Sequence, residues 1–124
     1  MIDTPRTVYR VISSEDWEAA QRTGIVPRCG ADVRDGFIHL STSDTMLETA
    51  NLYFQPEEAP LIVEVLTQAL GEALLWEVVT SRGGQRFPHL YAEGIPYEAI
   101  SALIELEPNI KEGRPFKLGA RRLV

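Results

Sequence analysis

The sequence predicts a single α+β domain in which strands outnumber helices. Five or six short runs are rich in β-branched and aromatic residues, whereas only two stretches show helical spacing of apolar residues, and both lie in the first half of the chain. The strands do not alternate strictly with helices, which argues against a doubly wound parallel sheet. We therefore expect a compact α+β fold whose second half is a mainly antiparallel sheet.

The expected elements follow from local signals. A hydroxyl N-cap at Ser13 and a closing glycine at Gly24 bound the first helix. Apolar residues three and four apart predict the second helix over residues 44–54. Between these helices we expect a loop over residues 25–35 that leads into a central strand. The expected strands cover residues 7–12, 36–41, 61–66, 74–79, 86–91 and 101–107.

Composition and charge exclude several classes of protein. The net charge of −6 argues against a general nucleic-acid binder, whose domains are usually basic. The single cysteine, Cys29, excludes an intramolecular disulfide, and with only two histidines the chain has no metal-ligand spacing. The first residues form no basic-then-apolar leader, and no run approaches the ~18 apolar residues of a membrane span. We expect a soluble cytoplasmic protein without a metal ion.

The end of the chain differs in charge from the rest. We expect residues 1–108 to form the domain, because Pro108 closes the last predicted strand. Residues 109–124 contain five lysine and arginine residues against the single acid Glu112. This segment is predicted to be a basic, solvated tail.

Two residues are unusual for the strands that contain them. Glu64 lies in the most apolar run, so its carboxylate requires a partner such as Arg10 or another basic group, or else an opening to solvent. Pro88 cannot donate a ladder hydrogen bond, so it implies an edge strand or irregular pairing.

The two histidines of the chain occur in the same local pattern. In both 37–41 and 87–91 the order is Phe, any residue, His, Leu and a hydroxyl side chain. Strand alternation places Phe37, His39 and Ser41 on one face. Histidine titrates near neutrality and both donates and accepts hydrogen bonds, so His39 and His89 could together hold a ribose, phosphate or carbonyl. The alternative is that each is a hydrogen-bonded residue of the core.

Hydroxyl and acidic residues near these motifs extend the candidate site. Thr42 and Ser43 precede the second predicted helix, where exposed N–H groups either bind an anion or are simply capped. Trp76 and Glu77 are on opposite faces of a strand, so only one of them faces a given pocket. Glu77 is a candidate general base or ribose anchor, and the alternative is a surface acid. No nucleophile elbow surrounds Ser41, which argues against a serine hydrolase.

The combined motifs resemble a bacterial domain of unknown function, DUF952. The resemblance is carried by Tyr9-Arg10, Trp17, Gly24, Gly36–Thr42, Trp76-Glu77 and Phe87–Tyr91, and covers roughly residues 7–106. It implies a relation to ADP-ribosyltransferases, which have a split sheet and an NAD-type cleft between the two half sheets.

The same resemblance implies roles for individual residues. His39 matches the histidine or arginine that holds the nicotinamide ribose, and Ser41 and Thr42 match a small hydroxyl motif after it. His89 and Tyr91 match a later strand of the cleft. Glu105 and Glu107 resemble the Glu-any-Glu spacing of some transferases, although two acids on a solvated strand face give the same pattern.

Three functions from different classes remain open on the sequence. The first is an enzyme that binds NAD or a related nucleotide and transfers or hydrolyses ADP-ribose, with His39, His89 and Glu77 as catalytic residues and Ser41, Thr42 and Tyr91 as ligand-binding residues. The second is a binding module that holds a small anionic or nucleotide ligand without turnover. The third is a structural or interaction protein in which both histidines are core residues.

Overall fold

The computed structural model describes residues 4–109 and 112–124, which form one small α+β domain. Its elements are β1 (Thr7–Ile12), α1 (Ser14–Thr23), β2 (Ile25–Pro27), α2 (Gly30–Asp35), β3 (Ile38–His39), α3 (Met46–Tyr53), η1 (Pro56–Glu58), β4 (Leu61–Leu66), η2 (Thr67–Ala69), η3 (Gly71–Ala73), β5 (Leu74–Val79), η4 (Thr80–Arg82), β6 (Gln85–Leu90), β7 (Gly94–Pro96), η5 (Tyr97–Ala99), β8 (Ile100–Asn109) and β9 (Arg114–Leu123). In the part of the chain that is described, no helix has the length and apolar character needed to cross a membrane.

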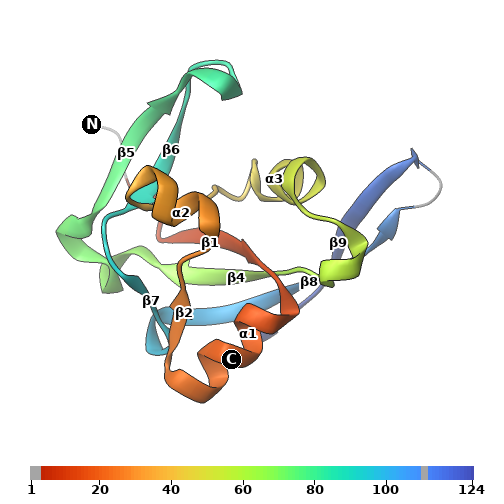
Figure 1. Cartoon of the computed structure of the whole chain (residues 1–124), viewed down its shortest axis with the longest axis horizontal. Helices are drawn as coiled ribbons and strands as arrows, with labels where there is room; N and C mark the ends of the chain where they lie inside the picture. The colour runs from red at the N-terminus through yellow and green to blue at the C-terminus, as the bar shows by residue number, and fades with distance from the viewer. Residues whose placement is uncertain (1–3, 110–111) are drawn as a thin grey trace.

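The strands form three sheets, and paired strands run antiparallel as the sequence predicts. The strand orders are β1-β4-β8-β9, β3-β6-β5 and β2-β7. Tyr9 and Ser41 exchange backbone hydrogen bonds of 2.8 and 2.7 Å, which join β1 to the residue just beyond β3. The two larger sheets therefore meet at the edge of β1 (Figure 1).

Both faces of the four-stranded sheet are covered. Alternate residues of β1 divide between two hydrophobic clusters: Val8 and Ile12 belong to one, and Val11 belongs to the other. The first cluster contains Trp17 from α1, and the second contains Met46 from α3. Figure 1 accordingly shows α1 and α3 on opposite sides of this sheet.

Three α-helices are present where the sequence predicted two. The prediction of a loop over residues 25–35 is wrong, because this segment contains β2 and α2. The additional helix is α2. Its first turn is closed by Asp32, whose Oδ2 accepts the N–H of Cys29 at 2.9 Å. It ends at Gly36, which has the left-handed φ of 84° that glycine tolerates best.

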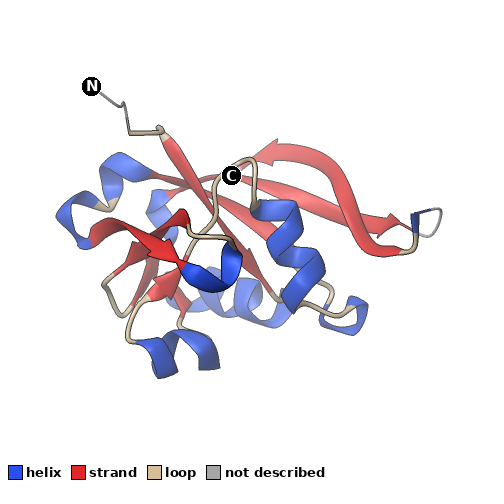
Figure 2. Cartoon of the chain, turned by 90° about the horizontal axis from the view of Figure 1, so that it is seen from above, coloured by secondary structure: helices blue, strands red, loops and turns tan. Residues whose placement is uncertain are grey.

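The residues expected to form a solvated tail include a full strand of the main sheet. Strand β9 pairs with β8, and the register matches Ala102 with Leu123 and Pro108 with Phe116. Strand β8 also continues through Pro108 to Asn109 instead of ending before it. The charged side chains of this segment suggested a solvated tail, but backbone pairing with β8 makes it a strand. The β8–β9 hairpin extends beyond the helices at one end of the molecule (Figures 1 and 2).

Arg121 of β9 is the basic partner of the buried acid Glu64, so the expected basic partner is confirmed, whereas the residue named as an example, Arg10, is wrong. The register pairs Tyr9 with Glu64, so Arg10 points to the opposite face of the sheet. Arg121 donates to both carboxylate oxygens at 2.9 and 2.8 Å, and Ser101 donates at 2.8 Å. The hydrogen bonds from Arg121 outweigh the effect of burial and hold the pKa of Glu64 below its ordinary value.

Pro88 lies on the middle strand of its sheet, and its pairing is irregular. The carbonyl of Pro88 accepts the N–H of Leu40 at 3.1 Å, but the proline nitrogen has no hydrogen to return. Strand β3 accordingly ends at His39. The edge position allowed by the sequence is wrong, whereas the irregular pairing is confirmed.

Replacing Arg121 by alanine should lower the free energy of unfolding by about 1–3 kcal/mol, because a buried carboxylate loses its main donors. Since the pKa of Glu64 is lowered in the folded state, this contribution is complete above the ordinary value of 4.5 and is lost as the pH falls through the lower folded pKa. The difference between wild type and variant should therefore shrink in acid, as measured by urea unfolding. Arg122→Ala removes an exposed neighbour and should cost no more than about 0.5 kcal/mol. Equal losses in both variants would contradict the assignment.

Candidate functional site

His39 and His89 lie directly opposite each other on neighbouring strands. The register of β3 and β6 pairs the two residues, and their ring centroids are 5.9 Å apart at an interplanar angle of 65°. Phe37 fills the space beside them, stacked on His89 at 4.0 Å and tilted against His39 at 4.6 Å. The repeated local pattern therefore brings both imidazoles to one place.

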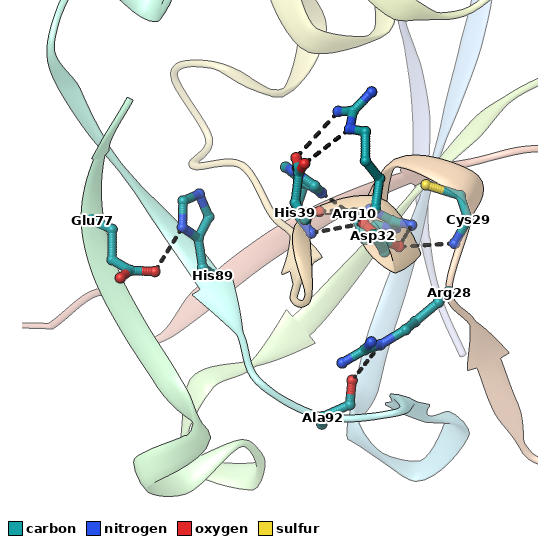
Figure 3. A network of polar contacts seen from close by, with 10 residues as sticks. Arg10, Arg28, Cys29, Asp32, His39, Glu77, His89 and Ala92 are labelled. Atoms are coloured by element: carbon teal, nitrogen blue, oxygen red, sulfur yellow. Dashed lines mark hydrogen bonds and ion pairs between the residues drawn. The ribbon is translucent and has the colours of Figure 1, made fainter. Parts of the chain in front are cut away.

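Asp32 fixes the orientation of His39. Its Oδ1 lies 2.7 Å from Nδ1 of His39 and accepts the backbone N–H of the same residue at 3.1 Å. Arg10 donates to both carboxylate oxygens and also to the carbonyl of His39 at 2.7 Å. Figure 3 shows Arg10, Asp32, Cys29 and His39 as one connected group.

The protonation of Asp32 is set by these contacts. Its side chain is fully buried, which opposes ionisation. Burial is outweighed by the hydrogen bond from the His39 ring, by the charge of Arg10 and by the backbone N–H groups of Cys29 and His39. Together these contacts hold the pKa of Asp32 well below its ordinary range. Asp32 is therefore an anion that neutralises Arg10 in the interior.

The other ring nitrogen of His39 also faces a carboxylate. Nε2 lies 2.8 Å from Oδ2 of Asp35, a residue at the end of α2 whose side chain is 32% exposed. The hydrogen bond from Arg34, with a further one from His39, outweighs desolvation and lowers the pKa of Asp35 to about 2. Both ring nitrogens of His39 therefore lie within hydrogen-bonding distance of a carboxylate.

His89 is held in a different way. Its Nδ1 lies 2.9 Å from Oε1 of Glu77, and the same oxygen accepts the hydroxyl of Tyr91 at 2.6 Å. These two hydrogen bonds, that of Tyr91 first, lower the pKa of Glu77. A carboxylate at Nδ1 fixes the tautomer in which Nε2 is the hydrogen-bond acceptor. Among the described residues Nε2 of His89 has no hydrogen-bond partner, and in Figure 3 it points away from Glu77.

A cavity of about 730 Å³ lies beside the paired histidines. We call it the histidine cleft; it is bounded by α2 and β3, by α3 and the edge of β1, and by the β5–β6 hairpin. His39, His89 and Ser41 line it, whereas Glu77, Thr42 and Tyr91 do not. Three of the six residues selected from sequence therefore face the same space, and Glu77 and Tyr91 lie behind His89.

The hydroxyl residues after His39 have distinct environments. Ser41 is buried, and its Oγ lies 2.9 Å from Oγ1 of Thr49 on α3. The N–H of Thr42 already donates to Oγ1 of Thr45 at 2.9 Å, so it serves the start of α3 and is not free for an anion. Within residues 4–109 and 112–124, no group of three or more His, Cys, Asp or Glu side chains is arranged to hold a metal ion.

Sequence reasoning missed six charged residues around the histidine cleft. Asp32 anchors it from within the core, and the other five line it: Arg10, Arg34, Asp35, Glu58 and Arg82. A local signal for Asp32 existed, because an acid three residues after the N-cap residue, here Cys29, is typical of the start of a helix. Gly36 marks the end of the same helix. No local signal connects Arg10 to Asp32, which is 22 positions further along the chain.

Replacing Asp32 by asparagine should destabilise the fold by about 3–5 kcal/mol, because Arg10 would remain as a buried charge without its counter-ion. Since the pKa of Asp32 is lowered in the folded state, its contribution is complete above the ordinary value of 3.8 and is lost as the pH falls through the folded value. The wild type should therefore lose stability in acid more steeply than Asp32→Asn, as measured by urea unfolding over a pH series. The control Asp44→Asn changes an exposed acid and should behave as wild type. Parallel pH profiles for wild type and Asp32→Asn would refute this role.

Comparisons with known proteins agree with the motifs and the fold. The model of a family described as a protein of unknown function, DUF952, matches residues 11–103. The crystal structure of the CC0527 protein of Caulobacter crescentus is 34% identical, with a TM-score of 0.77 over 88% of this chain and 92% of that chain. Its solution NMR structure is 34% identical, with a TM-score of 0.72 over 90% of this chain and 92% of that chain. No curated protein matches the sequence. The chain therefore belongs to the DUF952 family, whose function is unknown.

Proposed function

We propose that the histidine cleft binds NAD or a related nucleotide and that the protein transfers or hydrolyses ADP-ribose. The observation that carries this proposal is the pairing of His39 and His89 at 5.9 Å in one cleft, with a carboxylate at Nδ1 of each ring. Two imidazoles oriented in this way suit a ligand rich in hydroxyl groups, such as a ribose.

The arginines of the cleft lining support an anionic ligand. Three arginines line it, Arg10, Arg34 and Arg82. Each is paired with an acid of the protein itself, so the cleft has no net positive charge. An anion would therefore bind by replacing one of these acids on a guanidinium, whose paired N–H donors match phosphate oxygens.

The arrangement of the sheets supports the wider relation to ADP-ribosyltransferases. The four-stranded and three-stranded sheets meet at Tyr9 and Ser41, and the cleft lies next to this junction. A ligand cleft beside the junction of two half sheets is what the resemblance implies for those enzymes. Fold analogy alone does not assign a reaction, so the proposal depends on the site.

The contacts suggest separate roles for the two histidines. His39 would donate to a ribose hydroxyl from Nε2, with the partly exposed Asp35 moving aside for the ligand. His89 would act as general base through Nε2: it takes a proton from water as the water oxygen bonds to the anomeric carbon and the nitrogen–sugar bond breaks, releasing nicotinamide. We assign Glu77 to positioning His89, because it does not line the cleft.

The second candidate is a binding module without turnover. The observation in its favour is that the acids lining the cleft are Asp35 and Glu58, of which Asp35 is already paired with Arg34 and His39. A glycosyl transfer centre normally places a carboxylate against the sugar. Under this reading the same residues hold the nucleotide and no bond is broken.

Thermal unfolding with NAD, ADP-ribose and nicotinamide tests whether the cleft is used. A ligand at a hundred times its Kd stabilises the folded state by about 2.7 kcal/mol, which raises Tm by several degrees in a domain of this size. We expect this rise with NAD or ADP-ribose in the wild type and its loss in His39→Gln. The control Arg86→Gln alters an exposed residue outside the cleft and should retain the full rise. An undiminished rise in His39→Gln would remove the cleft from the proposal.

Replacing Glu77 by glutamine separates catalysis from binding. The amide no longer enforces the acceptor tautomer of His89, so the rate of NAD hydrolysis should fall by about tenfold or more while Kd changes little. Rates followed by nicotinamide release, with Kd from calorimetry, give the two readouts. An unchanged rate in Glu77→Gln would exclude the general-base role of His89, and no hydrolysis in the wild type would favour the binding module.

A further inference from the structure

Arg82 occupies an unusual position for an arginine in a surface turn. It lies in η4, at the tip of the β5–β6 hairpin, yet only 10% of its side chain is exposed. The guanidinium lies 4.6 Å from the ring centroid of Phe87 and 5.9 Å from that of Tyr53. The two rings hold the cation at the wall of the histidine cleft, which Arg82 and both rings line.

The hydrogen bonding of Arg82 is incomplete for a buried guanidinium. Its Nε and Nη2 both donate to a single oxygen of Glu48, at 3.2 and 2.7 Å. Its contacts with Oγ1 of Thr49 are long, at 3.4 and 3.5 Å. Guanidinium carries five donors in a planar fork that matches two oxygens of a carboxylate or phosphate, and Glu48 uses only one oxygen.

The acid that neutralises Arg82 is readily exchanged. The Glu48 side chain is 61% exposed, so it regains water when it leaves the guanidinium. An exposed partner contributes little to an ion pair, which lowers the cost of its replacement by a ligand anion. Arg82 would remain in place, because its aromatic contacts do not depend on Glu48.

Arg82 lies at a different end of the cleft from the paired histidines. Phe87, which the guanidinium covers, lies two residues before His89 on β6, and two residues of a strand span roughly 7 Å. Ser41 lies two residues after His39, and through Thr49 it joins the same end of the cleft. The cleft therefore has a histidine end and an arginine end, an arrangement that suits a ligand with a sugar at one end and a phosphate at the other.

We propose that Arg82, supported by Phe87 and Tyr53, binds the phosphate groups of the cleft ligand and that this anion displaces Glu48. The inference rests on the proposed function, since it assumes that the ligand fills the histidine cleft, and it names the chemical class: a sugar or nucleoside with a diphosphate. No bond is made or broken at Arg82. Glu48 acts as an internal competitor that occupies the guanidinium when the cleft is empty.

Calorimetric titration of three probes, ADP-ribose, inorganic pyrophosphate and adenosine, tests this assignment. Arg82→Gln should weaken the binding of ADP-ribose and pyrophosphate by about tenfold or more and leave adenosine unchanged. Glu48→Gln should have the opposite effect and tighten both anions severalfold, which a merely structural role for the pair would not produce. Arg86→Gln, the matched arginine outside the cleft, should bind all three probes as wild type does. If Arg82→Gln fails to fold, Glu48→Gln and Arg82→Lys replace it in the test. Arg82→Lys should lose an intermediate amount of anion affinity, because lysine keeps the positive charge but lacks the planar set of paired donors.

The outcomes distinguish this inference from the broader proposal. ADP-ribose affinity that is unchanged in Arg82→Gln or Glu48→Gln but lost in His39→Gln would overturn the role of Arg82 and leave the nucleotide site in place. Pyrophosphate binding that depends on Arg82, without any affinity for NAD or ADP-ribose, would support the anion site and reject the nucleotide. Failure of the wild type to bind either anion would overturn both.

Discussion

The buried carboxylate of Asp32 is the interaction on which the geometry of this domain depends. It accepts hydrogen bonds from Arg10 of β1, from the backbone at the start of α2 and from two nitrogens of His39 in β3. A buried charge is tolerated only when its partners are present together, so these three elements must assemble as a unit. The relative position of the two larger sheets and the orientation of one candidate catalytic residue are therefore fixed by the same group.

The two histidines have the same sequence setting but different electrostatic settings. His39 is held between Asp32 and Asp35, with both ring nitrogens engaged, whereas His89 is held only at Nδ1 by Glu77. The first arrangement favours a ring that donates, and the second favours a ring that accepts. A local repeat has thus produced two different groups, because the carboxylates that act on them come from different elements of the fold.

The features predicted from sequence are those that depend on neighbours in the chain. Alternation placed Phe37, His39 and Ser41 on one face, and all three line the histidine cleft, whereas Ile38 between them is buried in the core. The cap of α1 at Ser13 and its end at Gly24 were also predicted, and both are confirmed. The resemblance to DUF952 is confirmed over residues 11–103, although it carried no information on which acids orient the histidines.

The features missed from sequence depend on pairing across long distances. Strand β9 has three alternating apolar residues, Phe116, Leu118 and Ala120, among many charged ones. It is held by backbone pairing with β8, by burial of Phe116 in the second hydrophobic cluster and by the contact of Arg121 with Glu64. Helix α2 is only six residues long, too short for a periodic pattern to emerge. The charge pair between Arg10 and Asp32 could be predicted only from the fold, because the two residues are 22 positions apart in the chain.

Each arginine that lines the cleft has an internal acidic partner, and the exposure of that partner indicates which cation a ligand can reach. The pairs are Arg10 with Asp32, Arg34 with Asp35 and Arg82 with Glu48, and the exposed fractions of the acids are 0%, 32% and 61%. An acid that returns to water when displaced opposes a ligand weakly, whereas one that stays in the interior cannot be displaced without leaving a buried charge. Arg10 is on this argument structural, although it lines the cleft. The proposed anion would therefore be bound by an arginine whose partner lies at the surface, and of these Arg82 is the one whose side chain is only 10% exposed and lies against two aromatic rings.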